Sequence, residues 1–166
     1  MERYTLSVLV ENHAGVLSRV AGLFSRRGFN IDSLSVGPTQ DEKISRITIE
    51  VYGDELLLEQ ISKQLSKLVE VIKIKILRTS EIVKRGLVLV KVKVTPKTRS
   101  EVMEITSVFR ANIVDISNMT LTIELTGGNG KLNAFLELLE PYGIEEIART
   151  GMTALERGTN TLKFDK

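Results

Sequence analysis

The chain has 166 residues, enough for one domain of ordinary size or for two small domains of about 80 residues each. Its 23 basic and 21 acidic residues leave a net charge of +2, which provides no general field for attracting nucleic acid or an anionic membrane. The absence of cysteine excludes disulfides, thiolate nucleophiles and sulfur-ligated metal sites.

Hydrophobic periodicity predicts alternating strands and helices in the first half of the chain. Leu6, Val8 and Val10 recur at every second position, which is the spacing of a strand. From Val16 the apolar residues follow helical spacing as far as Gly28, a residue suited to the left-handed conformation that ends many helices. The predicted elements are strands at 4–11, 29–36, 47–51 and 72–76, and helices that begin near Val16 and after Gly53-Asp54.

The second half repeats this order after a polar and charged segment, residues 78–86 (RTSEIVKRG), which we predict to be a linker. The predicted elements are strands at 88–94, 113–117, 121–125 and 144–148, a helix with Val102, Ile105, Val108 and Phe109 on its inner face, and a helix at 131–139. The predicted domains are therefore residues 1–77 and residues 87–166.

Each half has the element order β-α-β-β-α-β. This order predicts an antiparallel four-stranded sheet with both helices on one face, the ferredoxin-like arrangement. We therefore expect an α+β protein made of two tandem ferredoxin-like units. The fold alone does not identify a function, because many unrelated functions use it.

Catalytic chemistry is not visible in the residue pattern. The only histidine, His13, stands in a strand-to-helix loop without a neighbouring motif that would orient a base. Glu145 and Glu146 are neighbours in a predicted strand, so their carboxylates point to opposite faces. Residues 127–131 (GGNGK) lie between a strand and a helix but lack the glycine spacing and the hydroxyl residue of a phosphate-binding loop.

The segment Asn12-His13-Ala14-Gly15-Val16-Leu17 is the most informative part of the sequence. A glycine before a helix allows close approach of a ligand or a second chain. The free N–H groups of the first helical turn, together with the helix dipole, favour binding of a carboxylate. Asn12 has two interpretations at this stage, as a cap of the helix or as a ligand-binding residue.

Several segments resemble one known family. They are residues 11–39 (ENHAGVLSRVAGLFSRRGFNIDSLSVGPT), 45–51 (SRITIEV), 58–74 (LEQISKQLSKLVEVIKI), 131–139 (KLNAFLELL) and 148–158 (ARTGMTALERG). In this order they resemble the small, regulatory subunit of acetolactate synthase, also called acetohydroxyacid synthase, whose N-terminal part is an ACT domain. The resemblance covers nearly the whole chain.

The resemblance implies a subunit without catalytic activity. Such a subunit activates a large subunit, which carries thiamine diphosphate, magnesium and FAD, and makes it subject to feedback inhibition by a branched-chain amino acid such as valine. No cofactor and no metal are expected in this chain. The ACT domains of the family pair across a two-fold axis, so a homodimer and a large subunit are the expected partners.

The resemblance also implies an effector site between two ACT domains. Asn12, Gly15, Val16 and Leu17 of one protomer would hold the carboxylate and backbone of the amino acid. Asn30, Ile31 and the region of Val36 would close over it from the other protomer. The alternative is an ACT-domain sensor that regulates another enzyme or transcription, although no helix-turn-helix segment is visible.

We expect no nucleic-acid or membrane partner. No apolar run approaches the ~20 residues that cross a bilayer, and residues 1–12 (MERYTLSVLVEN) lack the pattern of a signal peptide. A cytoplasmic location is therefore expected.

Overall fold

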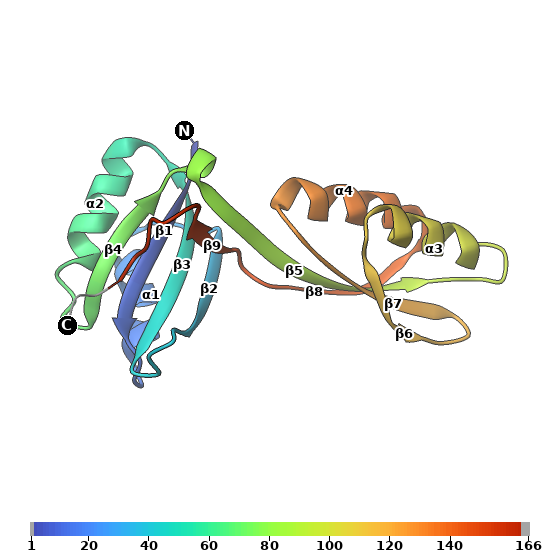
Figure 1. Cartoon of the computed structure of the whole chain (residues 1–166), viewed down its shortest axis with the longest axis horizontal. Helices are drawn as coiled ribbons and strands as arrows, with labels where there is room; N and C mark the ends of the chain where they lie inside the picture. Colours follow the sequence, from blue (N-terminus) through green and yellow to red (C-terminus); the bar gives the residue numbers. More distant parts are fainter. Residues whose placement is uncertain (1, 164–166) are drawn as a thin grey trace. The chain divides into compact units, whose positions relative to one another are not determined.

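The computed structural model describes residues 2–163, which fall into two units (Figure 1). The N-terminal unit comprises the residues up to Val83 together with those from Met152 onward, and the C-terminal unit comprises Lys84–Gly151. Both units are α+β, as the element order predicts. Among the described residues, no helix is long and apolar enough to cross a membrane.

The N-terminal unit contains an antiparallel sheet of four strands in the order β2-β3-β1-β4, with two helices. Its elements are β1 (Glu2–Glu11), α1 (Val16–Arg27), β2 (Ser33–Pro38), β3 (Ile44–Gly53), α2 (Glu55–Leu65) and β4 (Val71–Leu77). They lie close to the ranges that periodicity predicts, except that β2 begins at Ser33, so residues 29–32, which were predicted as strand, form a loop. The two edges of this sheet are β2 and β4, and β2 pairs with β3 alone on this path.

The core of this unit lies between the sheet and its helices. Alternate residues of β1, Leu6, Val8 and Val10, are buried there and contact the apolar faces of the helices. Gly28 ends α1 with a φ of 67°, the predicted left-handed conformation. Asp54 begins α2, where its carboxylate accepts a hydrogen bond of 2.9 Å from the backbone N–H of Leu57.

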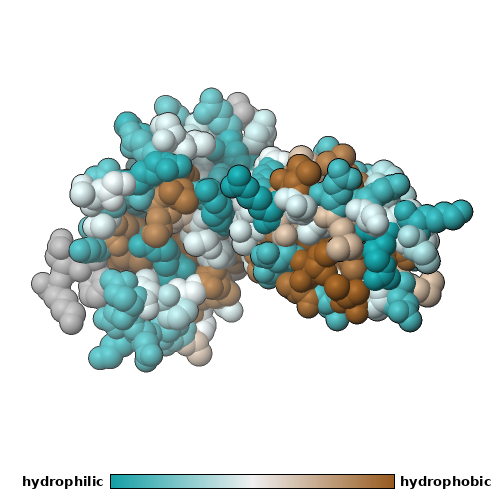
Figure 2. Space-filling view, turned by 45° about the vertical axis from the view of Figure 1, so that its right-hand side comes forward, coloured by the Kyte–Doolittle hydropathy of each residue, from teal (hydrophilic) through white to brown (hydrophobic). Residues whose placement is uncertain are grey.

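The C-terminal unit repeats the same topology in a sheet with the order β6-β7-β5-β8. Its elements are β5 (Ile82–Lys93), α3 (Arg99–Val108), β6 (Asn112–Ile116), β7 (Thr120–Gly127), α4 (Asn129–Leu139) and β8 (Ile144–Arg149). Val88, Val90 and Val92 of β5 are buried against the helices. Exposed apolar side chains of this unit include Val114, Ile116 and Met119, and apolar surface on the unit is visible in Figure 2.

The division of the chain differs from the predicted one in two places. The expected linker, residues 78–86, consists of a short 3₁₀ turn at Thr79–Glu81 followed by the start of β5, because Lys84 and Arg85 are tolerated on an exposed strand. Residues from Met152 onward belong to the N-terminal unit, not to the second domain. They include an unpredicted strand, β9 (Thr153–Glu156), which pairs with β5.

The prediction that Val108 belongs to the core of the second unit is wrong. Val108 is 73% exposed, whereas Val102 and Thr106 of α3 are buried. At 100° per residue, Val108 lies about 240° around the helix from Val102, which turns it away from the sheet. The Thr106 hydroxyl is buried in the core, where it donates a 2.7 Å hydrogen bond to the carbonyl of Val102.

Candidate functional site

The loop between β1 and α1 is shaped by Gly15. Its φ of 90° and ψ of −16° place it in the left-handed region, where it precedes the first turn of α1. A Cβ at this position would meet nothing within 4 Å, so the backbone conformation alone requires glycine. The carbonyl of Gly15 accepts the N–H of Arg19 at 3.0 Å, which closes the first turn of the helix.

Asn12 does not cap α1, which has no side-chain cap. Instead its side-chain amide donates a 2.7 Å hydrogen bond to the carbonyl of Glu42, and its backbone N–H donates to the carbonyl of Lys43 at 2.8 Å. The capping interpretation of Asn12 is therefore wrong. The residue fastens the loop to the turn between β2 and β3.

The first turn of α1 retains free hydrogen-bond donors. Val16 N–H has a long 3.4 Å contact with the carbonyl of His13. For the N–H groups of Leu17 and Ser18, residues 2–163 provide no acceptor, and the turn contains no acidic side chain. Free N–H groups at the positive end of a helix dipole are suited to an anion such as a carboxylate.

Charged side chains surround the loop in opposite pairs. His13 contacts Glu11 at 3.0 Å and the carbonyl of Ala14 at 3.1 Å. The hydrogen bond to Ala14, followed by the one to Glu11, raises the pKa of His13 above its usual value. Arg19 of α1 forms an ion pair with Glu70, whose side chain is largely buried. These pairs leave the loop without a dominant charge that would oppose a carboxylate.

The remaining predicted residues of the first group lie on α1. Val16 is 4% exposed and belongs to the core, so only its backbone is available to a ligand. Leu17 is 40% exposed and offers an apolar side chain beside the free N–H groups.

Asn30 and Ile31 of the second predicted group lie just beyond the other end of α1, whereas Val36 lies further along the chain, within β2. Asn30 donates a 2.8 Å hydrogen bond from its amide to Asp32, and Ile31 packs partly buried against the core. Val36 is 46% exposed on the edge strand β2. Because the 12 residues of α1 separate Asn12 and Gly15 from Asn30 and Ile31, the two groups are about 18 Å apart along the helix. One chain alone does not bring them together.

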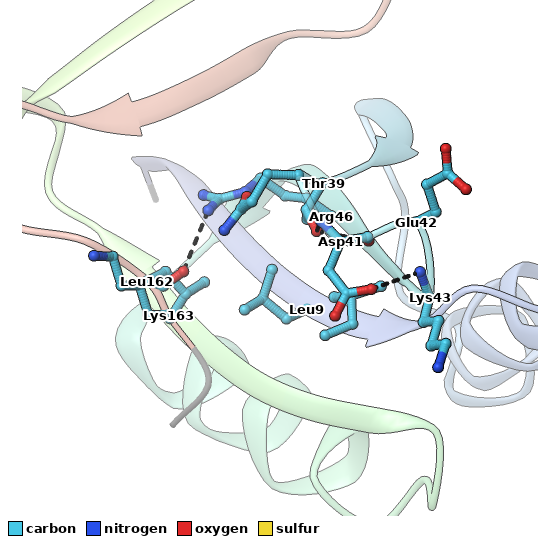
Figure 3. A pocket seen from close by; sticks show the side chains of 10 residues that line it. Leu9, Thr39, Asp41, Glu42, Lys43, Arg46, Leu162 and Lys163 are labelled. Atoms are coloured by element: carbon cyan, nitrogen blue, oxygen red, sulfur yellow. Dashed lines mark hydrogen bonds between the residues drawn. The ribbon is translucent and has the colours of Figure 1, made fainter. Parts of the chain in front are cut away.

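An open groove on the outer face of the same sheet was not predicted from sequence (Figure 3). Leu9, Ile44 and Leu162 form a small apolar cluster there. Arg46 donates to the carbonyl of Leu162 at 3.4 Å and to the hydroxyl of Ser7 at 3.1 Å. Burial lowers the pKa of Arg46, and nearby Glu156 partly opposes this shift. Sequence reasoning missed the groove because it placed residue 162 in the other domain.

Metal-binding groups do not stand out in the structure. Within residues 2–163, His, Asp and Glu side chains form no group of three or more that could hold a metal ion.

Comparison with known proteins identifies the family. Residues 6–73 match the model of an AHAS small subunit-like ACT domain, and residues 85–158 match that of the small subunit of acetolactate synthase. The acetolactate synthase small subunit of Mycobacterium bovis is 54% identical over 155 residues, covering 93% of this chain and 92% of its own length. The acetolactate synthase small subunit of Mycolicibacterium smegmatis is 52% identical over 155 residues, covering 93% of this chain and 91% of its own length.

A solved structure agrees with both matches. The crystal structure of the acetolactate synthase small subunit from Thermotoga maritima superposes with a TM-score of 0.91 at 40% identity, covering 96% of this chain and 100% of that one. The two predicted units, the ACT character of the first and the overall resemblance are thereby confirmed. The chain belongs to the family of acetolactate synthase small subunits.

Proposed function

We propose that this chain activates a catalytic acetolactate synthase large subunit and makes it subject to feedback inhibition by a branched-chain amino acid, with valine as the expected effector. The observation that carries the proposal is the free first turn of α1, where the N–H groups of Leu17 and Ser18 lack acceptors within residues 2–163. Such donors suit the carboxylate of an amino acid.

The effector site requires two copies of the chain. The residues around Gly15 and those around Asn30 lie at opposite ends of α1, so a compact site that uses both groups needs a partner chain in the reverse orientation. The edge strand β2 pairs with β3 alone within its sheet, which leaves one edge for pairing across a two-fold axis. We therefore propose a homodimer through the N-terminal units.

The chemistry of the site matches an aliphatic amino acid. The helix N-terminus takes the carboxylate, and the exposed side chains of Leu17 and Val36 contact the aliphatic group from the two protomers. Asn30 uses its amide nitrogen on Asp32, which leaves its oxygen as an acceptor for the ammonium group. An aliphatic pocket separates valine from leucine or isoleucine by only about 1–3 kcal/mol per methylene.

We propose that the chemistry of acetolactate formation takes place in the large subunit. Thiamine diphosphate, magnesium and FAD would be bound there and none of them in this chain. The small subunit would act through contacts made by its N-terminal unit.

Reconstitution tests this proposal. The chain is purified alone and together with an acetolactate synthase large subunit, and acetolactate formation is measured with and without valine. We expect no turnover by the chain alone, activation of the large subunit, and inhibition by valine. An ACT-domain sensor of another enzyme or of transcription would bind an amino acid without activating the large subunit.

Oligomeric state provides a second test. Sedimentation at micromolar concentration with valine present should show a dimer or a larger assembly. A monomer under these conditions would contradict the shared site.

A further inference from the structure

Residues 152–163, which we call the C-terminal strap, cross the outer face of the N-terminal sheet, the face away from α1 and α2 (Figure 1). The strap contains β9 and is separated from β8 of the C-terminal unit only by Thr150 and Gly151. Its contacts reach all four strands of the N-terminal sheet, through Ser33 and Ser35 on β2, Arg46 on β3, Leu9 on β1, and Lys73 and Lys75 on β4.

One end of the strap is attached to β2. The backbone N–H of Met152 donates a 2.8 Å hydrogen bond to the hydroxyl of Ser33. The hydroxyls of Thr153 and Ser35 are 3.1 Å apart and share a second hydrogen bond. Ser35 immediately precedes Val36, whose side chain belongs to the proposed effector site. The start of the strap is therefore bonded to the strand that would contact the effector.

The other end of the strap lies beside the turn that holds residues 12–15, the loop of the proposed effector site, which we call the effector loop. Leu162 packs against Ile44, and its carbonyl accepts a hydrogen bond from Arg46 (Figure 3). Glu42 and Lys43, which line the same groove, are the residues whose carbonyls accept from Asn12. One end of the strap thus contacts β2, and the other contacts Ile44, which immediately follows the turn that holds Asn12.

Polar contacts hold the middle of the strap. Glu156, whose side chain is 10% exposed, accepts a 2.7 Å hydrogen bond from Lys75, and Arg157 N–H donates to the carbonyl of Glu81 at 2.7 Å. The sheet face beneath is also polar, since Thr5, Ser7 and Thr48 are buried on it. Met152, Ala154 and Leu162 of the strap are buried as well, so both polar and apolar contacts attach the strap to the sheet.

We infer that the C-terminal strap couples occupancy of the effector site to the C-terminal unit. This inference rests on the proposed function. An effector that contacts Val36 and the loop around Asn12 fixes β2 and the turn after it, and both ends of the strap become fixed with them. Because the strap continues from β8, effector binding acts on the last strand of the C-terminal unit. Ser33, Ser35 and Thr153 are positioning residues for this coupling and do not touch the effector.

The test uses the full chain reconstituted with the large subunit. In the parent, saturating valine should slow amide hydrogen exchange of residues 152–156 by about fivefold or more, the low end of common allosteric couplings. In the double variant Ser33→Ala/Ser35→Ala, valine should no longer slow this exchange. Inhibition by valine should fall to less than half of the parental level, while calorimetric valine affinity stays within about threefold and activation is retained.

Two further variants guard against simple misfolding. Thr153→Val keeps the shape of the side chain, removes the hydroxyl that meets Ser35, and should weaken inhibition in the same direction. Ser35→Thr keeps a hydroxyl at this position and should retain parental inhibition. Ser107→Ala, on the exposed side of α3 in the C-terminal unit, is the matched control and should leave exchange and inhibition unchanged.

The outcomes separate the two proposals. If the double variant and Thr153→Val are inhibited as fully as the parent, or if valine leaves strap exchange unchanged in the parent, the coupling role of the strap is overturned while the proposed function stands. If the parent does not bind valine or any branched-chain amino acid, the proposed function fails, and the coupling fails with it.

Discussion

The junction from β1 to α1 and the junction from β5 to α3 occupy the same place in two units of the same topology. At the first, Gly15 is left-handed and the N–H groups of Leu17 and Ser18 find no acceptor within residues 2–163. At the second junction, Thr95 and Thr98 bind each other. The Thr98 hydroxyl accepts a 2.9 Å hydrogen bond from the Thr95 N–H, and the Thr95 hydroxyl accepts one of 3.2 Å from the Thr98 N–H.

Charge distinguishes the two junctions further. The first turn of α3 contains Glu101, which accepts a 3.0 Å hydrogen bond from the hydroxyl of Tyr142, whereas the first turn of α1 contains no acidic residue. A carboxylate at α3 already uses the attraction of the helix dipole and would repel a second anion. Two units of the same ferredoxin-like topology therefore differ in how well their first helical turns suit an anion, because side chains and one glycine set this difference.

The largest expected effect comes from changing the first junction to resemble the second in charge. Gly15→Asp should abolish valine binding, because two unit charges about 4 Å apart at an effective dielectric near 20 repel by about 4 kcal/mol, approaching a thousandfold in affinity. The positive φ of Gly15 adds strain of about 1–3 kcal/mol for any side chain. Calorimetric titration with valine measures the effect.

Gly15→Ala is the matched control for this variant, because it introduces the strain without the charge. Its thermal stability should fall at least as far as that of Gly15→Asp, because Asp tolerates a positive φ better than Ala, while part of its valine affinity is retained. Equal valine affinity in Gly15→Asp and the parent would show that the effector does not bind at this helix terminus.

A second prediction concerns the outer face of the N-terminal sheet, which the strap covers. Lys75→Met leaves the Glu156 carboxylate in a largely buried position without its hydrogen-bonding partner and should cost about 1–3 kcal/mol of unfolding free energy. Glu156→Gln should cost less, because Lys75 is 38% exposed and water can solvate its ammonium group. Chemical denaturation of both variants measures the difference, and an equal or reversed order would contradict the assigned burial.

A third prediction compares one residue from each junction. Asn12→Ala removes the hydrogen bond to Glu42 and should weaken valine binding by about 0.5–1.5 kcal/mol, which is severalfold in affinity. Thr98→Ala removes the bond to Thr95 N–H and should lower stability by a similar amount without changing valine affinity. Calorimetry and thermal unfolding on both variants separate the effects. A change in valine affinity in Thr98→Ala would mean that the second junction also takes part in binding.

Local sequence patterns were sufficient to predict the secondary-structure elements and the glycine that ends α1. Among residues 2–163, period-two and helical spacing predicted all four α-helices and every strand but β9, and Gly28 indicated the end of α1. The role of Asn12 was not predictable in this way, because its partner Glu42 lies 30 residues further along the chain. A residue before a helix satisfies the local rule for a cap even when a distant carbonyl takes its amide.

The strap could not be predicted from hydrophobic periodicity because its pattern is inverted. In β9, Leu155 is 56% exposed, while Glu156 points inward with a side chain that is 10% exposed. The buried carboxylate is stabilised there by its hydrogen bond from Lys75 of β4 and by the nearby charge of Arg46, and these partners are 81 and 110 residues away in sequence. The domain boundary was misplaced for the same reason.

The smallest expected effect is the pH dependence of the first junction, which has no counterpart in the second because His13 is the only histidine of the chain. Both ring nitrogens of His13 face oxygen acceptors, the carbonyl of Ala14 and the carboxylate of Glu11, and this arrangement favours the doubly protonated ring. The pKa of His13 is raised above its usual value of 6.5 by these bonds. Stability that arises from them is fully present below pH 6.5 and is lost as the pH rises through the raised pKa of the folded chain.

Valine keeps its carboxylate ionised throughout this range, so a change in affinity reports on the protein. The positive charge on His13 favours an anion at the neighbouring helix terminus, and we expect valine affinity to decrease modestly, by less than about threefold, as the ring loses its proton. His13→Gln keeps a hydrogen-bonding side chain but does not titrate, so its valine affinity should be flat over the same pH range. NMR titration of the ring measures the pKa directly. A pKa of His13 at or below 6.5, or an equal pH profile in His13→Gln, would show that the pair with Glu11 does not influence the effector loop.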